Sequence, residues 1–261
     1  MTTLKFRVLG PFEVVCDGRL LDVGPTKQRA TLAMLLMHAN TVVPTDRLLD
    51  GLWSGEPPVN ARHALQVYVS NLRKLLKSGR SPGGNGQVLI TRRPGYLLSV
   101  PSEQLDAACF ERLVANGRQA LTDGRVGEAS ELLRAALGLW RGPALADLTD
   151  LPFTRAQIPR LEQLRLQALE ARLDADLALG RHVDLVGELE TLVAMHPLRE
   201  RFWIQLMLAL YRASRQGEAL QTYQAARELL IEQLGIDPGM EMRQLQTAIL
   251  RQDPTLASPA G

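Results

Sequence analysis

The first part of the chain has the hydrophobic pattern of a small antiparallel sheet. Apolar residues recur at alternating positions between Phe6 and Cys16, as in strands with one buried face. Asp17 and Gly18 follow, and glycine tolerates the positive φ that a tight hairpin turn requires. We therefore expect a hairpin whose returning strand covers about residues 19–23.

The pattern then changes to a helical period, which predicts three helices. Thr26 is expected to cap a helix over about 27–39, and Thr45 to cap a short helix over about 45–53. The third helix covers about 60–77 and reads NARHALQVYVSNLRKLLK. Apolar stripes at helical spacing define a buried face on the first and third helices. The first stripe contains Ala30, Leu32, Ala33, Leu35, Leu36 and His38 or Ala39; the second contains Ala61, Leu65, Tyr68, Leu72, Leu75 and Leu76.

A second hairpin is predicted over residues 88–100, VLITRRPGYLLSV, with its turn at Arg92–Gly95. A segment rich in glycine and serine, 78–87, precedes it and is expected to be flexible. Strands, three helices and a hairpin are the order of elements in a winged helix-turn-helix, here with an additional N-terminal sheet. In that fold the third helix enters the DNA major groove and the hairpin forms the wing.

The C-terminal part, from about residue 106, is predicted to be helical throughout and to contain tetratricopeptide-like repeats. The small residue of one repeat is Ala219, and related positions recur around Leu185 and, after an insertion near 140–154, around Ala129. Three helix pairs and a closing helix near 238–252 would form a small solenoid. The matching positions are Gly117, Leu133, Ala136, Leu189, Pro197, Trp203, Leu206, Leu210, Tyr223 and Ala226.

The net charge changes sign near the boundary between the predicted winged helix and the predicted helical part. Residues 1–100 hold 13 Lys and Arg against 6 Asp and Glu, a net of +7, whereas the remainder has a net of −5. A basic N-terminal domain joined to an acidic one favours binding of a polyanion by the first. We expect a DNA-binding domain over 1–101, a helical domain over 106–253 and a tail over 254–261.

The predicted third helix carries side chains that suit DNA on the face opposite its apolar stripe. Gln66 and Asn71 can pair with adenine, Arg62 with guanine, and Val67 can contact a thymine methyl group. His63 and Ser70 lie on the same face, and Arg73, Lys74 and Lys77 suit phosphates, which add affinity without sequence information. The alternative is that much of this face is solvated polar surface.

Other classes of function have less support in the sequence. No phosphate-binding loop and no metal-ligand spacing is present, so we expect no cofactor, no metal and no enzymatic activity. The two cysteines and the absence of an export signal or membrane span fit a cytoplasmic protein. A protein-interaction scaffold remains an alternative, although the basic N-terminal part argues against it.

Specific motifs extend this interpretation to a family. Leu48-Leu49, Trp53, Leu72-Arg73 and Thr91-x-Arg93-x-Gly95-Tyr96 resemble the output domain of OmpR-type response regulators. LWRGPALADL (139–148) and the segment over 206–245 resemble the bacterial transcriptional activation domain. Together they resemble the Streptomyces antibiotic regulatory protein family, of which this chain looks like a small, stand-alone member.

The resemblance implies an activator of a biosynthetic gene cluster. Such a protein binds tandem direct repeats near the −35 element as two side-by-side protomers, and recruits RNA polymerase through its sigma and alpha subunits. The resemblance also places Arg93, with Arg92 beside it, in the minor groove and Trp53 on a phosphate. Thr26, Lys27 and Arg47 are weaker phosphate candidates. The loop with Gly51, Ser54, Gly55, Glu56 and Pro57 corresponds to a polymerase-contacting segment. The alternatives are an exposed turn for the arginines, core packing for Trp53 and a plain connector for the loop.

Overall fold

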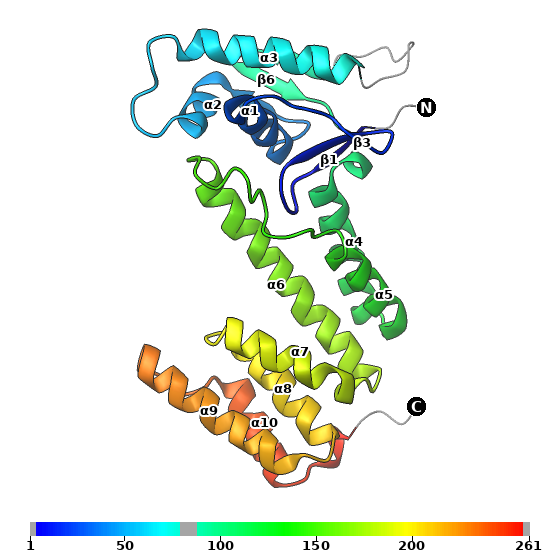
Figure 1. Ribbon diagram of the computed structural model, residues 1–261. Coiled ribbons are helices and arrows are strands. Elements are labelled where there is room, and N and C mark those ends of the chain that lie inside the picture. Colours follow the sequence, from blue (N-terminus) through cyan, green and yellow to red (C-terminus); the bar gives the residue numbers. More distant parts are fainter. Residues whose placement is uncertain (1–3, 79–87, 258–261) are drawn as a thin grey trace. The chain divides into compact units, whose positions relative to one another are not determined.

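The computed structural model describes residues 4–78 and 88–257, and its contacts divide into two compact units (Figure 1). The first unit contains Met1–Val114 and Ala135–Leu166, and the second contains Ala115–Arg134 and Gln167–Gly261. This division does not coincide with the domain boundary expected between residues 101 and 106. Residues 79–87 of the expected flexible segment lie outside the described residues. None of the described helices is long and apolar enough to cross a lipid bilayer.

The first unit contains the winged helix-turn-helix that the sequence predicts. A three-stranded antiparallel sheet, β1 (Leu4–Arg7), β2 (Glu13–Cys16) and β3 (Arg19–Leu20), precedes it, with β2 in the centre. Its elements are α1 (Thr26–Met37), β4 (Val42–Pro44), α2 (Thr45–Leu52), α3 (Ala61–Ser78), β5 (Leu89–Arg92) and β6 (Gly95–Leu98). The second sheet has the antiparallel order β4-β6-β5, and its β5–β6 hairpin is the wing.

Helix α1 is buried on every side, and not only along the predicted stripe. Every residue from Ala30 to Leu36 is buried, including Thr31, whose hydroxyl donates to the Lys27 carbonyl at 2.7 Å. A helix that is apolar all round belongs in the centre of a domain, and α1 contacts α2, α3 and β6. The last predicted stripe positions, His38 and Ala39, are half-buried.

The predicted threonine caps of α1 and α2 were wrong. Each helix begins at the threonine itself, and Pro25 and Pro44 occupy the N-cap positions without a side-chain cap hydrogen bond. Proline before the threonine holds the chain extended and moves the helix start by one residue. Thr45 instead donates its backbone N–H (3.2 Å) and its hydroxyl (3.1 Å) to the carbonyl of Pro94, which fastens α2 to the turn of the wing.

Strand β4 was not predicted, because three residues show no alternation and their partner lies far along the chain. Val42 pairs with Leu97 and Pro44 with Gly95. Proline is tolerated there because β4 is an edge strand. Gly95 is required by the close approach of the strands, since a β-carbon on it would lie 1.8 Å from the Val43 carbonyl oxygen.

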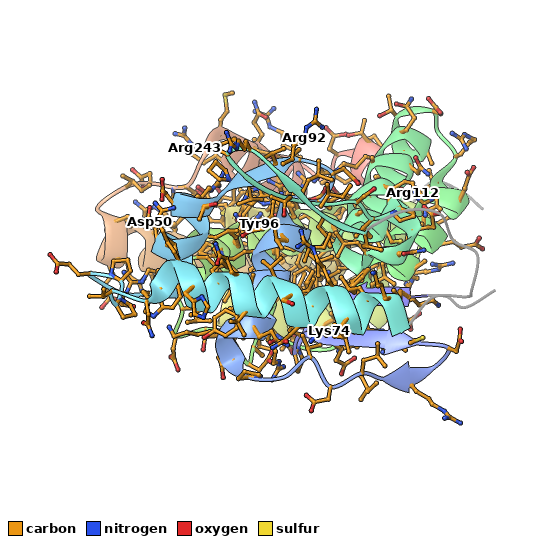
Figure 2. All side chains as sticks on the ribbon, turned by 90° about the horizontal axis from the view of Figure 1, so that it is seen from above. Asp50, Lys74, Arg92, Tyr96, Arg112 and Arg243 are labelled. Carbon is orange, nitrogen blue, oxygen red and sulfur yellow. The ribbon has the colours of Figure 1, made fainter. Side chains whose placement is uncertain are left out.

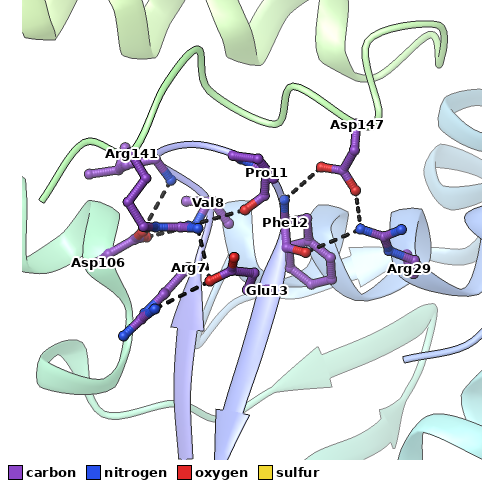
Figure 3. A network of polar contacts seen from close by, with 10 residues as sticks. Arg7, Val8, Pro11, Phe12, Glu13, Arg29, Asp106, Arg141 and Asp147 are labelled. Carbon is purple, nitrogen blue, oxygen red and sulfur yellow. Dashed lines mark hydrogen bonds and ion pairs between the residues drawn. The ribbon is translucent and has the colours of Figure 1, made fainter. Parts of the chain in front are cut away.

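Backbone hydrogen bonds explain why residues 135–166 belong to the first unit. The segment that follows β1 accepts hydrogen bonds from the predicted insertion: Arg141 N–H donates to Leu9 O at 2.8 Å, and Leu145 N–H donates to Val8 O at 3.1 Å. Arg141 also reaches the carbonyl of Pro11 (3.1 Å) and the carboxylate of Glu13 (2.8 Å) with its guanidinium. This insertion is therefore an integral part of the first unit (Figure 3).

Two carboxylates complete this network (Figure 3). Asp106 accepts the N–H groups of Val8 (2.9 Å) and Leu9 (3.1 Å). Burial raises the pKa of Asp106, while these N–H donors and the nearby Arg141 act in the opposite direction. Asp147 accepts the N–H of Phe12 at 2.6 Å and forms an ion pair with Arg29 of α1. The buried α1 is thereby connected to the chain that follows the winged helix.

The helices beyond the wing confirm the predicted repeats. They are η1 (Ser102–Gln104), α4 (Asp106–Thr122), α5 (Val126–Leu137), α6 (Thr154–Ala178), α7 (His182–Met195), α8 (Glu200–Arg212), α9 (Gln216–Leu234), α10 (Met240–Leu250) and η2 (Pro254–Leu256). In the second unit, Ala129 and Ala219 are completely buried, and Gly117 permits the close approach of Leu133. α8 packs between α7 and α9, and α10 covers α8 and α9 (Figure 1). The start of the expected tail forms η2, and Leu256 O accepts a hydrogen bond from Arg212 at 3.0 Å.

Replacing Gly95 with alanine should destabilise the wing. The new methyl group has no room against Val43, so β4 and β6 must separate, at a cost of about 1–3 kcal/mol. Chemical denaturation followed by circular dichroism measures the loss. Gly187→Ala is the matched control, because nothing lies within 4 Å of its β-carbon position in α7; there alanine should stabilise by about 0.5–1 kcal/mol. Equal stabilities of the Gly95→Ala variant and the parent would contradict the close approach of β4 to β6 at Gly95.

Candidate nucleic-acid interface

Helix α3 presents a polar and basic face opposite its buried side. Ala61, Leu65, Val69, Leu72 and Leu76 are buried; Val69 was missing from the predicted stripe, and the predicted Tyr68 and Leu75 are only half-buried. The exposed candidates are Arg62, His63, Gln66, Val67, Ser70, Asn71, Lys74 and Lys77. Figure 2 looks down onto α3 and labels Lys74. The structure therefore brings the predicted reading residues together on one accessible helix face.

Arg73 differs from its neighbours on α3 because its guanidinium is directed towards the wing. It is half-buried and donates from Nε to Leu89 O at 2.9 Å and from Nη2 to Thr91 Oγ1 at 2.7 Å. Both acceptors belong to β5. Arg73 thus fixes the wing against α3, a role that the sequence did not reveal because the contact joins two separate elements.

The tip of the wing exposes its two arginines. Arg92 ends β5 and Arg93 follows in the turn, and both are exposed; Arg92 is labelled in Figure 2. Tyr96 is buried in β6, as expected for a residue that packs the wing on the core. The exposed guanidinium groups and the α3 face belong to the same compact unit.

A third group of candidates lies where α1 begins and α2 ends. Lys27 Nζ donates to the carbonyl of Leu52 at 2.7 Å and lies 4.6 Å from the ring centroid of Trp53. Burial lowers the pKa of Lys27. Trp53 is half-buried, and its indole N–H donates to none of the described residues. Thr26 is exposed beside them. An ammonium, an indole N–H and a hydroxyl together can contact a phosphate.

The predicted polymerase-contacting segment divides into Gly51, which belongs to the last turn of α2, and an exposed loop after the helix. Gly51 is buried, and a β-carbon there would lie 2.2 Å from Met34 Cε and 3.2 Å from Phe153 Cβ. Its prediction as a polymerase contact was therefore wrong, because packing covers it. Ser54, Gly55, Glu56 and Pro57 are all exposed.

Two other candidates have partners in the structure. Arg62 forms an ion pair with Asp46 of α2 at 2.5 Å, but both side chains are more than half exposed. Such pairs contribute little stability, so Arg62 can exchange this partner for another. Asn71 donates from Nδ2 to Gln28 Oε1 at 3.1 Å. Gln28 is buried in α1, and its position between Lys27 and Arg29 in the sequence gave no sign of a link to α3.

The described residues contain no cluster of three or more histidine, cysteine, aspartate or glutamate side chains that could hold a metal ion. The first unit carries an exposed polar and basic face on α3 and two exposed arginines at the tip of the wing. This arrangement suits a helix in the major groove and a guanidinium in the adjacent minor groove of duplex DNA.

Two family models match the chain in the same regions. The C-terminal domain of transcriptional regulatory proteins matches residues 23–98. The bacterial transcriptional activator domain matches residues 105–250. The first match covers α1 to the wing, and the second covers the helical repeats.

Related proteins share both regions. The chain is 39% identical to regulatory protein DnrI of Streptomyces peucetius, over 96% of this chain and 93% of DnrI. It is 43% identical to regulatory protein AfsR of Streptomyces coelicolor, over 97% of this chain and 25% of AfsR. It is 42% identical to transcriptional regulatory protein EmbR of Mycobacterium tuberculosis, over 96% of this chain and 64% of EmbR. The chain therefore spans less than two thirds of AfsR and EmbR.

A solved structure has the same fold. Mycobacterium tuberculosis EmbR in complex with a low-affinity phosphopeptide matches with a TM-score of 0.92 at 39% identity. The match covers 100% of this chain and 67% of the EmbR chain. The OmpR-like winged helix followed by a helical domain is therefore the fold of this chain.

Removing Arg73 should lower the free energy of unfolding more than removing Lys74, its neighbour on α3. Arg73→Ala deletes two hydrogen bonds from a charged donor to β5 and should reduce the free energy of unfolding by about 1–3 kcal/mol. Lys74→Ala removes an exposed cation and should change it by no more than about 0.5 kcal/mol. Thermal unfolding of both variants measures the difference. If the two substitutions were equally harmless, Arg73 would not hold the wing.

Proposed function

Since the chain belongs to the Streptomyces antibiotic regulatory protein family of transcriptional activators, we propose that it activates a secondary-metabolite gene cluster. It binds tandem direct repeats near the −35 element of its promoters, as two protomers side by side. It then recruits RNA polymerase through contacts with the sigma and alpha subunits. The protein acts in the cytoplasm, on the nucleoid, where its promoters lie.

One observation carries the DNA-binding part of this proposal. An exposed, polar and basic helix face and an exposed arginine wing belong to one compact unit. In the proposed complex, Gln66 and Asn71 read adenine, Arg62 reads guanine and Val67 contacts a thymine methyl group. His63 and Ser70 complete the face, while Lys74, Lys77, Lys27, Thr26 and Trp53 contact phosphates.

The wing supplies the remaining contacts. Arg93 enters the minor groove, whose negative potential attracts a guanidinium, and Arg92 lies beside it. Arg73 keeps the wing at a fixed distance from α3 by its hydrogen bonds to Leu89 and Thr91. Major-groove and minor-groove contacts are therefore made together.

Activation is assigned to the exposed loop after α2. Ser54, Gly55, Glu56 and Pro57 lie next to Trp53, so a protomer whose Trp53 meets a phosphate presents this loop close to the DNA. A polymerase subunit bound at the −35 element would meet the loop there. Direct repeats need no two-fold interface, so the protomers contact one another head to tail on DNA.

Removing two candidate cations should weaken DNA binding and its dependence on salt. The Lys74→Ala and Arg93→Ala double variant loses two cationic contacts, so the slope of log K against log salt should flatten by about 1–2. Fluorescence anisotropy with a direct-repeat duplex measures both quantities. The matched control is Lys5→Ala with Arg112→Ala, which removes the same charges from exposed positions on β1 and α4. Identical slopes in the two double variants would contradict the proposed surface.

The loop should matter for transcription and not for DNA affinity. Glu56→Ala should reduce transcript yield about fivefold, which corresponds to losing roughly 1 kcal/mol of contact with polymerase. In vitro transcription from a direct-repeat promoter, at saturating activator, measures this effect. Glu103→Ala in η1 removes an exposed carboxylate elsewhere and serves as control. Unchanged transcription by the Glu56→Ala variant would remove Glu56 from the polymerase interface.

A further inference from the structure

Gln28 is a polar side chain enclosed by the first unit, with only 6% of its surface exposed. Its Nε2 donates to the backbone carbonyl of Val23 at 2.6 Å. Gly24 makes room for this amide: a β-carbon on Gly24 would lie 3.0 Å from Nε2, and its φ of +90° disfavours any other residue. Since a carbonyl oxygen can only accept, the nitrogen end of Gln28 must point to Val23.

The orientation of Gln28 determines the orientation of Asn71. With Nε2 at Val23, the oxygen Oε1 of Gln28 faces α3, where it accepts a hydrogen bond from Asn71 Nδ2 at 3.1 Å. An amide oxygen cannot donate, so Asn71 must present its nitrogen to Gln28. The hydrogen-bond chain from Asn71 through Gln28 to Val23 therefore has one polarity, set by a backbone carbonyl. Among the described residues, none donates to Oδ1 of the exposed Asn71.

We propose that Gln28 is a positioning residue for base recognition, which holds the Asn71 amide with Oδ1 facing the DNA. This inference rests on the proposed function. An outward Oδ1 with the second N–H beside it matches adenine, whose major-groove edge offers the N6 amine and the N7 acceptor. Cytosine offers only its N4 amine, whereas guanine and thymine offer acceptors, which can take the second N–H but leave Oδ1 without a donor. Asn71 therefore selects adenine, accepts cytosine less well and rejects guanine and thymine.

The alternative is that the Gln28–Asn71 hydrogen bond serves only to pack α3 on α1. Packing alone predicts a loss of stability when Gln28 is changed, and no change in base preference. Positioning predicts a change at one base of each repeat, since an unanchored asparagine can rotate its amide and offer either end. Base preference is thus the property that separates the two roles.

The experiment measures binding of the full chain to direct-repeat duplexes in which each base is varied in turn. We expect the parent protein to prefer adenine over guanine at one position of each repeat by about 5- to 150-fold. Asn71→Ala should abolish this preference. Gln28→Met, which keeps the shape but not the hydrogen bonds, should weaken it at the same position by at least about threefold and leave other positions unchanged. Thr31→Val is the matched control, because it removes a buried hydrogen bond of α1 that does not reach α3.

A second measurement needs no change at Gln28 and covers the case in which Gln28→Met does not fold. Replacing the preferred adenine with purine, which lacks the N6 amine, should weaken binding of the parent protein about as much as Asn71→Ala does. Purine should have no further effect on the Asn71→Ala variant.

Two results would overturn the inference while leaving the proposed function intact: a folded Gln28→Met variant with unchanged adenine preference, or a parent protein indifferent to purine. Failure of the parent protein to distinguish a direct-repeat duplex from random DNA would instead contradict the proposed function itself.

Discussion

Three consecutive side chains in the first turn of α1 reach three different parts of the first unit. Lys27 caps the end of α2 and lies over Trp53, Gln28 bonds to Asn71 on α3, and Arg29 pairs with Asp147. Successive residues of a helix point in directions about 100° apart, so one turn can serve three neighbours. The rest of α1 is enclosed by apolar packing, which keeps these directions fixed.

The proposed DNA-binding surface is positioned by the packing of α3 on this central helix. α3 is held on α1 by its buried stripe, and the wing is held on α3 by Arg73 and on α2 by the bonds from Thr45 to Pro94. Asp106 and Asp147 then hold the strands before α1 and the start of the activation domain in the same unit.

The features that were predicted from the sequence depend on residues close together along the chain. The Asp17–Gly18 turn and the helical repeats around Ala129 and Ala219 follow from turn chemistry and period, and the structure confirms them. On α3 the period located the buried face, but Val69 belongs to it, whereas the predicted Tyr68 and Leu75 are only half-buried. The order of the predicted elements indicated the winged helix-turn-helix, and the family resemblance added Arg92, Arg93 and Trp53 to the DNA-contact candidates. The candidates on one face of α3 and at the tip of the wing are exposed, as contact with DNA requires.

Contacts between residues that lie far apart in the sequence could not be predicted from local patterns. β4 is only three residues long and is defined by its pairing with β6. The partners of Arg73 and Asn71 lie 16 or more positions away, so no spacing rule could assign them. Gly51 resembled a loop residue because glycine marks turns, whereas Met34 and Phe153 cover it. Pro25 and Pro44 occupy the N-cap positions that were expected for Thr26 and Thr45.

In the proposed complex, α3 and the wing read the two grooves of a direct-repeat promoter together. Dimethyl sulfate footprinting tests it directly, because the reagent methylates guanine N7 in the major groove and adenine N3 in the minor groove. The proposed complex predicts that each repeat shows protected guanine N7 positions with protected adenine N3 positions beside them, on the same face of the helix. Protection confined to one groove, or spread evenly without the period of the repeats, would contradict it.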